Sequence, residues 1–360
     1  MADSKHTSAT TSATTSATAT GTSLAVPPRP GTRARVRRAA GAWLGAAGLG
    51  PRVRRSSGGP VAVILMYHAI LDDQNAAWID PANAISAASL ASHAKRLAAT
   101  GAVRPLADIA GEFAADGRVS RPSIAITFDD GYLDNVRLAA PILARHQLPA
   151  TLFVCPDVIA GASPQWIDRL HVLVQHGGAA ATAVAMGLSG AGDMSKELAA
   201  RALARHLLEL PSDRRDAELD AAAAALQPPV MPRLTVRPDE VVELARSGPE
   251  HGWTIGSHGR RHIDLAKAAA DELETDIAGS RTALADMLGE PPTLLSYPYG
   301  RRSDTAEAVA RAAGFTGAVI AGSDHDAVAG TDPMRLPRRE APAGDGAFRW
   351  TIAPAAGARS

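Results

Sequence analysis

The chain reads Ser123-Ile124-Ala125-Ile126-Thr127-Phe128-Asp129-Asp130-Gly131-Tyr132, and this stretch decides its fold. The apolar run at 123–126 is typical of a short buried strand. A glycine after two carboxylates predicts a tight turn with backbone angles that other residues avoid. Because Asp129 and Asp130 repel each other, the pair indicates a bound cation that leaves one carboxylate as ligand and the other as proton acceptor. Taken alone, the pair is more typical of a solvated turn.

A second group of polar residues occurs later in the chain. His258 and His262 follow the short apolar stretch 253–255. Residues four apart share one face of a helix, so the spacing predicts a helical turn whose two imidazoles reach one ion. With Asp130 they form a ligand set that leaves positions open for water and substrate, the pattern of a catalytic zinc. The same spacing is common on solvated helix faces, so the hypothesis depends on both groups occurring together.

Three motifs resemble those of the polysaccharide deacetylase superfamily (carbohydrate esterase family four, with the nodulation-factor deacetylase-like domain). Thr127–Gly131 matches its Thr-Phe-Asp-Asp-Gly motif in full. Residues 258–262 match its His-Ser/Thr-x-x-His motif, with Gly259 in place of the hydroxyl residue. Ser296–Gly300 matches its Pro-Tyr-Gly turn. The resemblance covers residues 60–340 and implies an α/β fold, a distorted (β/α) barrel with the motifs at the C-terminal strand ends.

The resemblance also implies a function and its residues. Asp129 would be the general base, Asp130, His258 and His262 would hold a divalent metal, with zinc expected, and the backbone N–H of Tyr299 would help to form an oxyanion hole. The implied activity is removal of N-acetyl groups from N-acetylhexosamine units of a polysaccharide or a lipid-linked glycan. The same groups would hydrolyse an O-acetyl ester. A non-catalytic carbohydrate-binding relative is the alternative from another class, although it would not need both carboxylates.

The general acid is the least regular part of the pattern. Many members of the superfamily supply it from a C-terminal Leu-x-His, but His325 is the only histidine after His262 and lies in a polar stretch. His68 instead ends the apolar run 61–67, which resembles the Met-Tyr-His strand of a circularly permuted subgroup that includes poly-N-acetylglucosamine deacetylases. A barrel brings both ends of its sheet together, so His68 is the candidate acid. The alternative is a histidine that caps the core.

The arginine that lies beside the general base in the superfamily is also missing from its usual place in this sequence. The superfamily places an arginine in its third motif, whereas Ser296 occupies that position here. Residues 336–338 read Leu-Pro-Arg and resemble a strand of the permuted subgroup. Arg338 is therefore the candidate for the charge that orients Asp129.

Composition narrows the class of protein. The 360 residues include 37 basic and 37 acidic side chains, so the net charge gives no argument for nucleic-acid binding. The single cysteine, Cys155, excludes an intrachain disulfide and is expected to be a buried thiol. The expected partner is an acetylated carbohydrate.

Residues 1–59 are expected to form a low-complexity, disordered extension, since 16 of the first 20 residues are Ser, Thr or Ala. Arginines flank a short apolar segment at 39–50 that is too short to span a bilayer. A secretory signal is one interpretation, but arginines occupy the expected cleavage region. We expect a non-cleaved, cytoplasmic protein, with peripheral membrane contact through this Arg-rich segment as a further hypothesis.

Alternating strand and helix signals predict a catalytic domain at 60–345 and a C-terminal tail at 346–360. Residues 165–250 interrupt the alternation with Ala- and Leu-rich helical patterns, which indicates a helical insertion near the substrate entrance. Trp166 lies at the start of this insertion. A packing role is expected for its ring, with stacking on a sugar ring as the alternative. Strands are expected at 61–67, 123–127, 150–154, 253–256, 293–297, 317–321 and 335–338, and helices at 86–99, 134–146, 196–210, 213–226, 239–246, 270–288 and 304–313.

Overall fold

The computed structural model describes residues 22–25, 59–247, 252–323 and 325–355. Most of the extension at 1–59, on which the predictions of disorder and membrane contact depend, therefore lies outside the described residues. Within the described ranges, no helix combines the length and the apolar composition that crossing a membrane requires.

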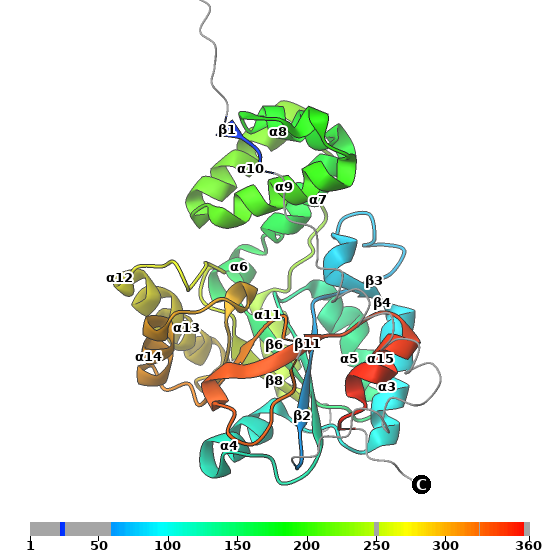
Figure 1. Cartoon of the computed structure of the whole chain (residues 1–360), viewed down its shortest axis with the longest axis vertical. Coiled ribbons are helices and arrows are strands. Elements are labelled where there is room, and N and C mark those ends of the chain that lie inside the picture. The colour runs from blue at the N-terminus through cyan, green and yellow to red at the C-terminus, as the bar shows by residue number, and fades with distance from the viewer. Residues whose placement is uncertain (1–21, 26–58, 248–251, 324, 356–360) are drawn as a thin grey trace, which may run out of the picture.

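Seven parallel strands of the described chain close into a barrel in the order β10-β11-β2-β5-β6-β8-β9 (Figure 1). The earliest of them in sequence, β2, lies between the latest, β11, and β5. The predicted (β/α) barrel is confirmed, and its closure brings the two ends of the sheet together. The strands are β2 (Ala62–Tyr67), β5 (Ser123–Phe128), β6 (Ala150–Val154), β8 (Trp253–Ser257), β9 (Leu294–Ser296), β10 (Gly317–Ile320) and β11 (Leu336–Glu340).

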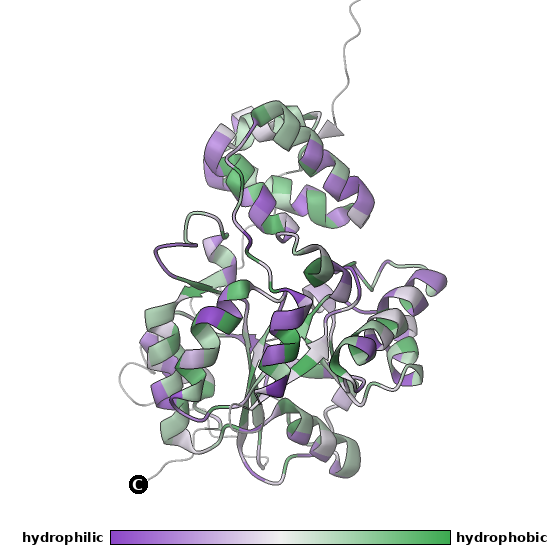
Figure 2. Ribbon diagram, turned by 180° about the vertical axis from the view of Figure 1, so that it is seen from behind, coloured by the Kyte–Doolittle hydropathy of each residue, from purple (hydrophilic) through white to green (hydrophobic). Residues whose placement is uncertain are grey.

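Helices surround the barrel, and hydrophobic and hydrophilic residues are interspersed along them (Figure 2). The best defined by sequence is α3, where Ser86 accepts a hydrogen bond from Ser89 N and Gly101 ends the helix at φ 63°. Its apolar side buries Leu90 and Leu97 against the barrel core. The set comprises α3 (Ala87–Thr100), α4 (Leu106–Asp116), α5 (Ala140–Ala144), α6 (Pro156–Gly161), α11 (Pro238–Arg246), α12 (Ala270–Leu273), α13 (Gly279–Leu288) and α14 (Asp304–Ala312).

Two predicted helices contain π-helical segments. The helix expected at 134–146 begins as η2 (Asn135–Ala139) before α5, and the one expected at 270–288 passes through η4 (Glu274–Ala278) between α12 and α13. π-Helical segments are rare and often occur at functional sites. Here Asn135 donates from Nδ2 to the carbonyl of His68 at 2.8 Å, and Asp276 accepts from the backbone of the 258–262 loop. The segments therefore carry side chains that hold the functional loops.

Of the insertion predicted at 165–250, α11 packs on the barrel core, whereas residues 166–226 form a separate helical lobe at one end of the barrel (Figure 1). Its helices are α7 (Trp166–Gly177), α8 (Ala179–Ala185), α9 (Lys196–Glu209) and α10 (Ser212–Leu226), and they enclose an apolar core of their own. Strand β1 (Thr22–Ser23) pairs in parallel with β7 (Leu188–Ser189) of the lobe, and Leu24 is buried in the lobe core. The sequence did not predict this strand within the extension.

The C-terminal segment differs from the expected tail. Residues from 345 onward form α15 (Asp345–Ile352), whose Phe348 and Ile352 are buried in the barrel core cluster. Phe348 stacks on His93 of α3, with ring centroids 3.6 Å apart. The prediction of a tail from residue 346 was wrong, because a short amphipathic helix at a chain end gives little periodic signal. Smaller elements are β3 (Ala69–Leu71), β4 (Ala84–Ser86), η1 (Pro81–Asn83), η3 (Ala191–Asp193), η5 (Pro298–Gly300) and η6 (Pro333–Arg335).

Candidate active site

The motif residues meet at the C-terminal ends of the barrel strands. Asp129 and Asp130 directly follow β5, His258 directly follows β8, and His262 lies in the loop that continues from it. All four are buried, with relative exposures of 7% or less. Parallel strands present their carboxyl ends on one side, which explains why residues distant in sequence converge there. Tyr299 joins them from the turn after β9.

Asp130, His258 and His262 form one compact cluster whose ligand atoms all lie within 4.8 Å of one another. Oδ1 of Asp130 is 3.4 Å from Nε2 of His258 and 3.2 Å from Nε2 of His262, yet it has no hydrogen-bond partner in the described structure. Nδ1 of His258 faces the carbonyl of Ser296 at 2.8 Å, so Nδ1 must be the protonated nitrogen and Nε2 offers a lone pair. Two buried lone-pair acceptors facing each other fit a divalent cation between them.

The expected helical turn for the two histidines is wrong. Residues 258–262 form a loop in which Gly259 has φ 73° and His262 has φ 58°, and neither value is helical. Asp276 holds this loop, since its carboxylate accepts the backbone N–H groups of Arg260 at 2.9 Å and Arg261 at 3.1 Å. A Cβ at Gly259 would lie 2.4 Å from Oδ1 of Asp276. The glycine that replaces the hydroxyl residue of the motif therefore makes room for the carboxylate.

Backbone strain is concentrated at the cluster. Among the described residues, six non-glycine residues have positive φ, and three of them are Asp130 at 72°, His262 at 58° and Tyr299 at 60°. Such angles cost free energy and persist where surrounding contacts fix them. Gly131, at φ 65°, continues the turn as the sequence predicted. The strain indicates that the loops are shaped to aim these side chains rather than to be locally stable.

Asp129 is held by Arg338, as the Leu-Pro-Arg pattern predicted. Nη1 and Nη2 of Arg338 donate to the two oxygens of Asp129 at 2.7 and 2.6 Å, and Arg338 is fully buried. Nη2 also donates to Oγ of Ser296 at 2.8 Å, and Nη1 donates to Oγ1 of Thr127 at 3.1 Å. The third motif has Ser296 of β9 where the superfamily has an arginine. Here the guanidinium that binds Asp129 comes instead from Arg338 of β11. This bidentate geometry fixes the plane of the carboxylate.

The electrostatic environment keeps both carboxylates ionised. Burial by itself raises the pKa of Asp129, but the charge of Arg338, followed by that of His258, outweighs burial and lowers it. Burial acts in the same way on Asp130, where His262 and His258 bring the pKa well below its usual value. Burial lowers the pKa of His258, yet the charges of Asp129 and Asp130 outweigh it and raise that pKa. An ionised Asp129 can accept a proton, and an ionised Asp130 can bind a cation.

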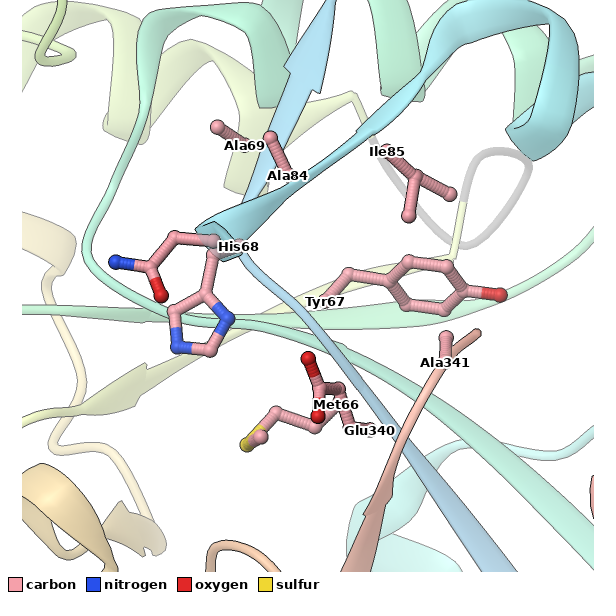
Figure 3. Close-up of a pocket in the computed structure, with 9 residues that line it drawn as sticks. Met66, Tyr67, His68, Ala69, Ala84, Ile85, Glu340 and Ala341 are labelled. Atoms are coloured by element: carbon pink, nitrogen blue, oxygen red, sulfur yellow. The ribbon is translucent and has the colours of Figure 1, made fainter. Parts of the chain in front are cut away.

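His68 lies at the end of β2, next to the strand that leads to Asp129. Tyr67 and Phe128 are register partners whose rings stack outside the barrel at a centroid distance of 5.2 Å. Side chains alternate along a strand, which places His68 and Asp129 on the opposite, inward side. Figure 3 shows Tyr67 and His68 leaving the chain in different directions; both line a pocket whose lining includes neither Asp129 nor the three residues Asp130, His258 and His262. The charge of His68 also contributes to lowering the pKa values of Asp129 and Asp130.

Tyr299 connects the cluster to the helical lobe. Its ring packs edge-on against His262 at a centroid distance of 4.6 Å. Its hydroxyl accepts a hydrogen bond from Nε1 of Trp166 at 3.0 Å and donates to the carbonyl of His262 at 3.4 Å. Trp166 is 9% exposed and belongs to the lobe core, so packing is its role here. Burial raises the pKa of Tyr299 to about 12, and the phenol remains protonated.

The remaining sequence expectations concern Cys155 and His325. Cys155 is fully buried, and its thiol donates to the carbonyl of His258 at 3.0 Å, which confirms the expected buried thiol. Burial raises the pKa of that thiol well above its ordinary value, so it is not a nucleophile. His325 is exposed, and its backbone N–H donates to Oγ of Ser323. Sequence analysis did not identify Asp276, because the pattern of a helix does not show which of several acidic residues will bind a neighbouring loop.

Comparisons with known proteins bear on the family and the fold. Residues 116–177 and 231–318 match the family model described as polysaccharide deacetylase, and the gap between the two segments contains α8–α10 of the lobe. A curated relative, YxkH of Bacillus subtilis (strain 168), carries the name of a candidate polysaccharide deacetylase and is 22% identical over 200 residues. The match covers 56% of this chain and 45% of that protein, so the chain spans about half the length of this relative.

Solved structures share the fold. The deacetylase PplD of Streptococcus pyogenes, in complex with acetate, aligns with a TM-score of 0.53 at 17% identity over 78% of this chain and 93% of that one. IcaB from Ammonifex degensii gives 0.52 at 18% identity over 82% and 98%, respectively. BC0361, a polysaccharide deacetylase from Bacillus cereus, gives 0.51 at 18% identity over 81% and 69%. At these identities the likeness confirms the barrel fold and nothing finer.

Proposed function

Because the chain contains a polysaccharide deacetylase domain, we propose that it is a metal-dependent hydrolase that removes N-acetyl groups from N-acetylhexosamine units of a polysaccharide or a lipid-linked glycan. The observation that carries the proposal is the buried cluster of Asp130, His258 and His262 beside the Asp129–Arg338 ion pair. A binding module would gain nothing from burying two ionised carboxylates next to each other, since each costs free energy unless it is paired.

Asp130, His258 and His262 would hold the metal, for which zinc fits the two nitrogens and one oxygen. When bound, such an ion supplies Lewis acidity, which activates water and polarises the acetyl carbonyl. Asp129 lies next to this cluster, with Oδ2 3.8 Å from Nε2 of His258, and would accept the proton that the attacking water loses. Arg338 keeps that carboxylate oriented and ionised between turnovers.

His68 is proposed as the general acid. Cleavage of an amide expels an amine, a poor leaving group that needs a proton, whereas an activated ester does not. The alternation argument supports His68 on the same side of the sheet as Asp129, and the charge of His68 acts on both Asp129 and Asp130. The backbone N–H of Tyr299, in a turn held at φ 60°, is proposed to donate to the developing oxyanion.

The test is acetate release from defined substrates by the purified full-length chain, with metal content measured in the same preparation. N-Acetylglucosamine oligomers should release acetate at a rate that Asp129→Asn lowers by orders of magnitude without loss of folded structure. Acetate released only from O-acetylated sugars would change the assignment to an esterase. Binding of the oligomers without acetate release from any substrate would replace the enzyme by a carbohydrate-binding protein.

A further inference from the structure

The helical lobe places a buried arginine, Arg215, next to the candidate active site. Arg215 lies in the first turn of α10 and is only 5% exposed, although arginine is rarely buried without a charged partner. Its neighbour Arg214, one residue earlier on the same helix, is exposed. The family model has no counterpart for this part of the chain, since its matched segments end at 177 and resume at 231.

The guanidinium of Arg215 has no anionic partner in the described structure. Nη1 donates to the hydroxyl of Tyr299 at 2.9 Å, and the guanidinium carbon lies 5.2 Å from the ring centroid of Trp166. Nε is buried without a hydrogen-bond partner. The adjacent carboxylate of Asp216 is engaged by Arg169 at 3.2 Å instead. Neutral contacts do not compensate for the desolvation of a charge. A bound anion would therefore stabilise this buried guanidinium.

This cation lies beside the metal-ligand cluster. The Tyr299 hydroxyl that accepts from Arg215 also donates to the carbonyl of His262, and the Tyr299 ring packs on the His262 imidazole. The charge of Arg215 contributes to the electrostatic environment of His262. By contrast, both Nη groups of Arg338 already donate to a carboxylate, that of Asp129. Among the described residues, Arg215 is thus a buried cation near the cluster that lacks an anionic partner.

We propose that Arg215 forms an oxyanion-binding subsite next to the catalytic cluster, which selects glycans that carry a carboxylate or phosphate group near the acetylated sugar. A planar guanidinium presents parallel N–H groups that match both kinds of oxyanion, and such charge-assisted bonds are strong when water is excluded. This inference rests on the proposed deacetylase function and adds the substrate class to it. The lobe then serves as the specificity element of the barrel.

A direct binding measurement tests the subsite without using activity. Inorganic phosphate is titrated calorimetrically into the wild-type chain, Arg215→Gln and Arg214→Gln, with metal content and melting temperature measured for each. We expect equal dissociation constants for wild type and Arg214→Gln, and a value raised about tenfold or more in Arg215→Gln, since a charge-assisted hydrogen bond is lost. Arg215→Lys, which keeps the charge but not the fork, should fall between them. Equal affinity in all variants overturns the proposal.

A substrate comparison identifies the source of the oxyanion and separates selection from positioning of Tyr299. A neutral N-acetylglucosamine oligomer is compared with matched oligomers that carry a carboxylate or a phosphate on the neighbouring sugar. Arg215→Gln should lower kcat/KM about tenfold or more for one or both anionic substrates, mainly through KM, and leave the neutral one nearly unchanged. An equal loss on all three, reproduced by Tyr299→Phe, would make Arg215 only a positioning residue. If wild type releases no acetate at all, the proposed function fails, while phosphate binding still decides the subsite.

Discussion

Replacing Arg338 by methionine should be the most damaging single change outside the cluster of Asp130, His258 and His262. Methionine retains most of the side-chain length but removes both hydrogen bonds to Asp129, at 2.7 and 2.6 Å, together with those to Ser296 and Thr127. Removing one partner of a buried ion pair costs about 3–5 kcal/mol, because the other charge stays buried and unpaired. That is a large part of the total stability of a domain.

Urea unfolding at pH 7 measures this loss, and a double-mutant cycle identifies its cause. If the orphaned carboxylate is responsible, Arg338→Met combined with Asp129→Asn should be more stable than Arg338→Met alone, by about 1–3 kcal/mol, since a neutral amide is cheaper to bury. Deacetylation should fall strongly in both. The reasoning is refuted if Arg338→Met unfolds within about 1 kcal/mol of wild type, or if the second substitution adds its full cost instead of relieving the first.

Three further predictions follow from individual contacts. His258→Ala should lose both stoichiometric metal and activity, and full metal content in this variant, measured by elemental analysis, would show that the ligand set is wrong. His68→Ala should impair amide hydrolysis far more than hydrolysis of an activated aryl acetate, whereas His325→Ala should change neither. Burial raises the pKa of Asp168 to about 7, so its folded form binds more protons than its unfolded form, and stability falls as pH rises from about 4 through 7. Asp168→Asn should therefore be more stable than wild type at pH 8, by at most about 4 kcal/mol, with no difference below about pH 4 in denaturant titrations; a pH-independent difference would contradict this.

The parts of the fold that sequence could predict are those in which local pattern and burial agree. The strand at 150–154 has its predicted bounds, and the helix predicted at 86–99 is found at Ala87–Thr100, shifted by one residue. The strand is a short, buried and mostly apolar run, and the helix is bounded by an N-cap serine, Ser86, and a terminating glycine, Gly101. The convergence of Asp130, His258 and His262 was also predictable, because residue types alone limit which side chains can share a cation.

The conformation around the ligands was not predictable, because it is set by contacts remote in sequence. The spacing of His258 and His262 suited a helix, but the loop follows the carboxylate of Asp276, which lies on a π-helical segment. The partner of Arg215 depends on how the lobe docks onto the turn that carries Tyr299. No periodicity in the chain reports either contact, since both depend on tertiary packing between elements.

The exchange of Ser296 and Arg338 shows why a motif can be incomplete in sequence and complete in space. β9 and β11 are separated by β10, yet Oγ of Ser296 lies 2.8 Å from Nη2 of Arg338, because both side chains point into the closed barrel. The guanidinium needs only to reach Asp129 from some strand around this interior, and the small Ser296 side chain leaves the necessary space. By the same reasoning, an acid can enter the site from β2 at the start of the domain. In a closed barrel, only the position of the charged group in the interior matters, and side chains from several strands can reach that position.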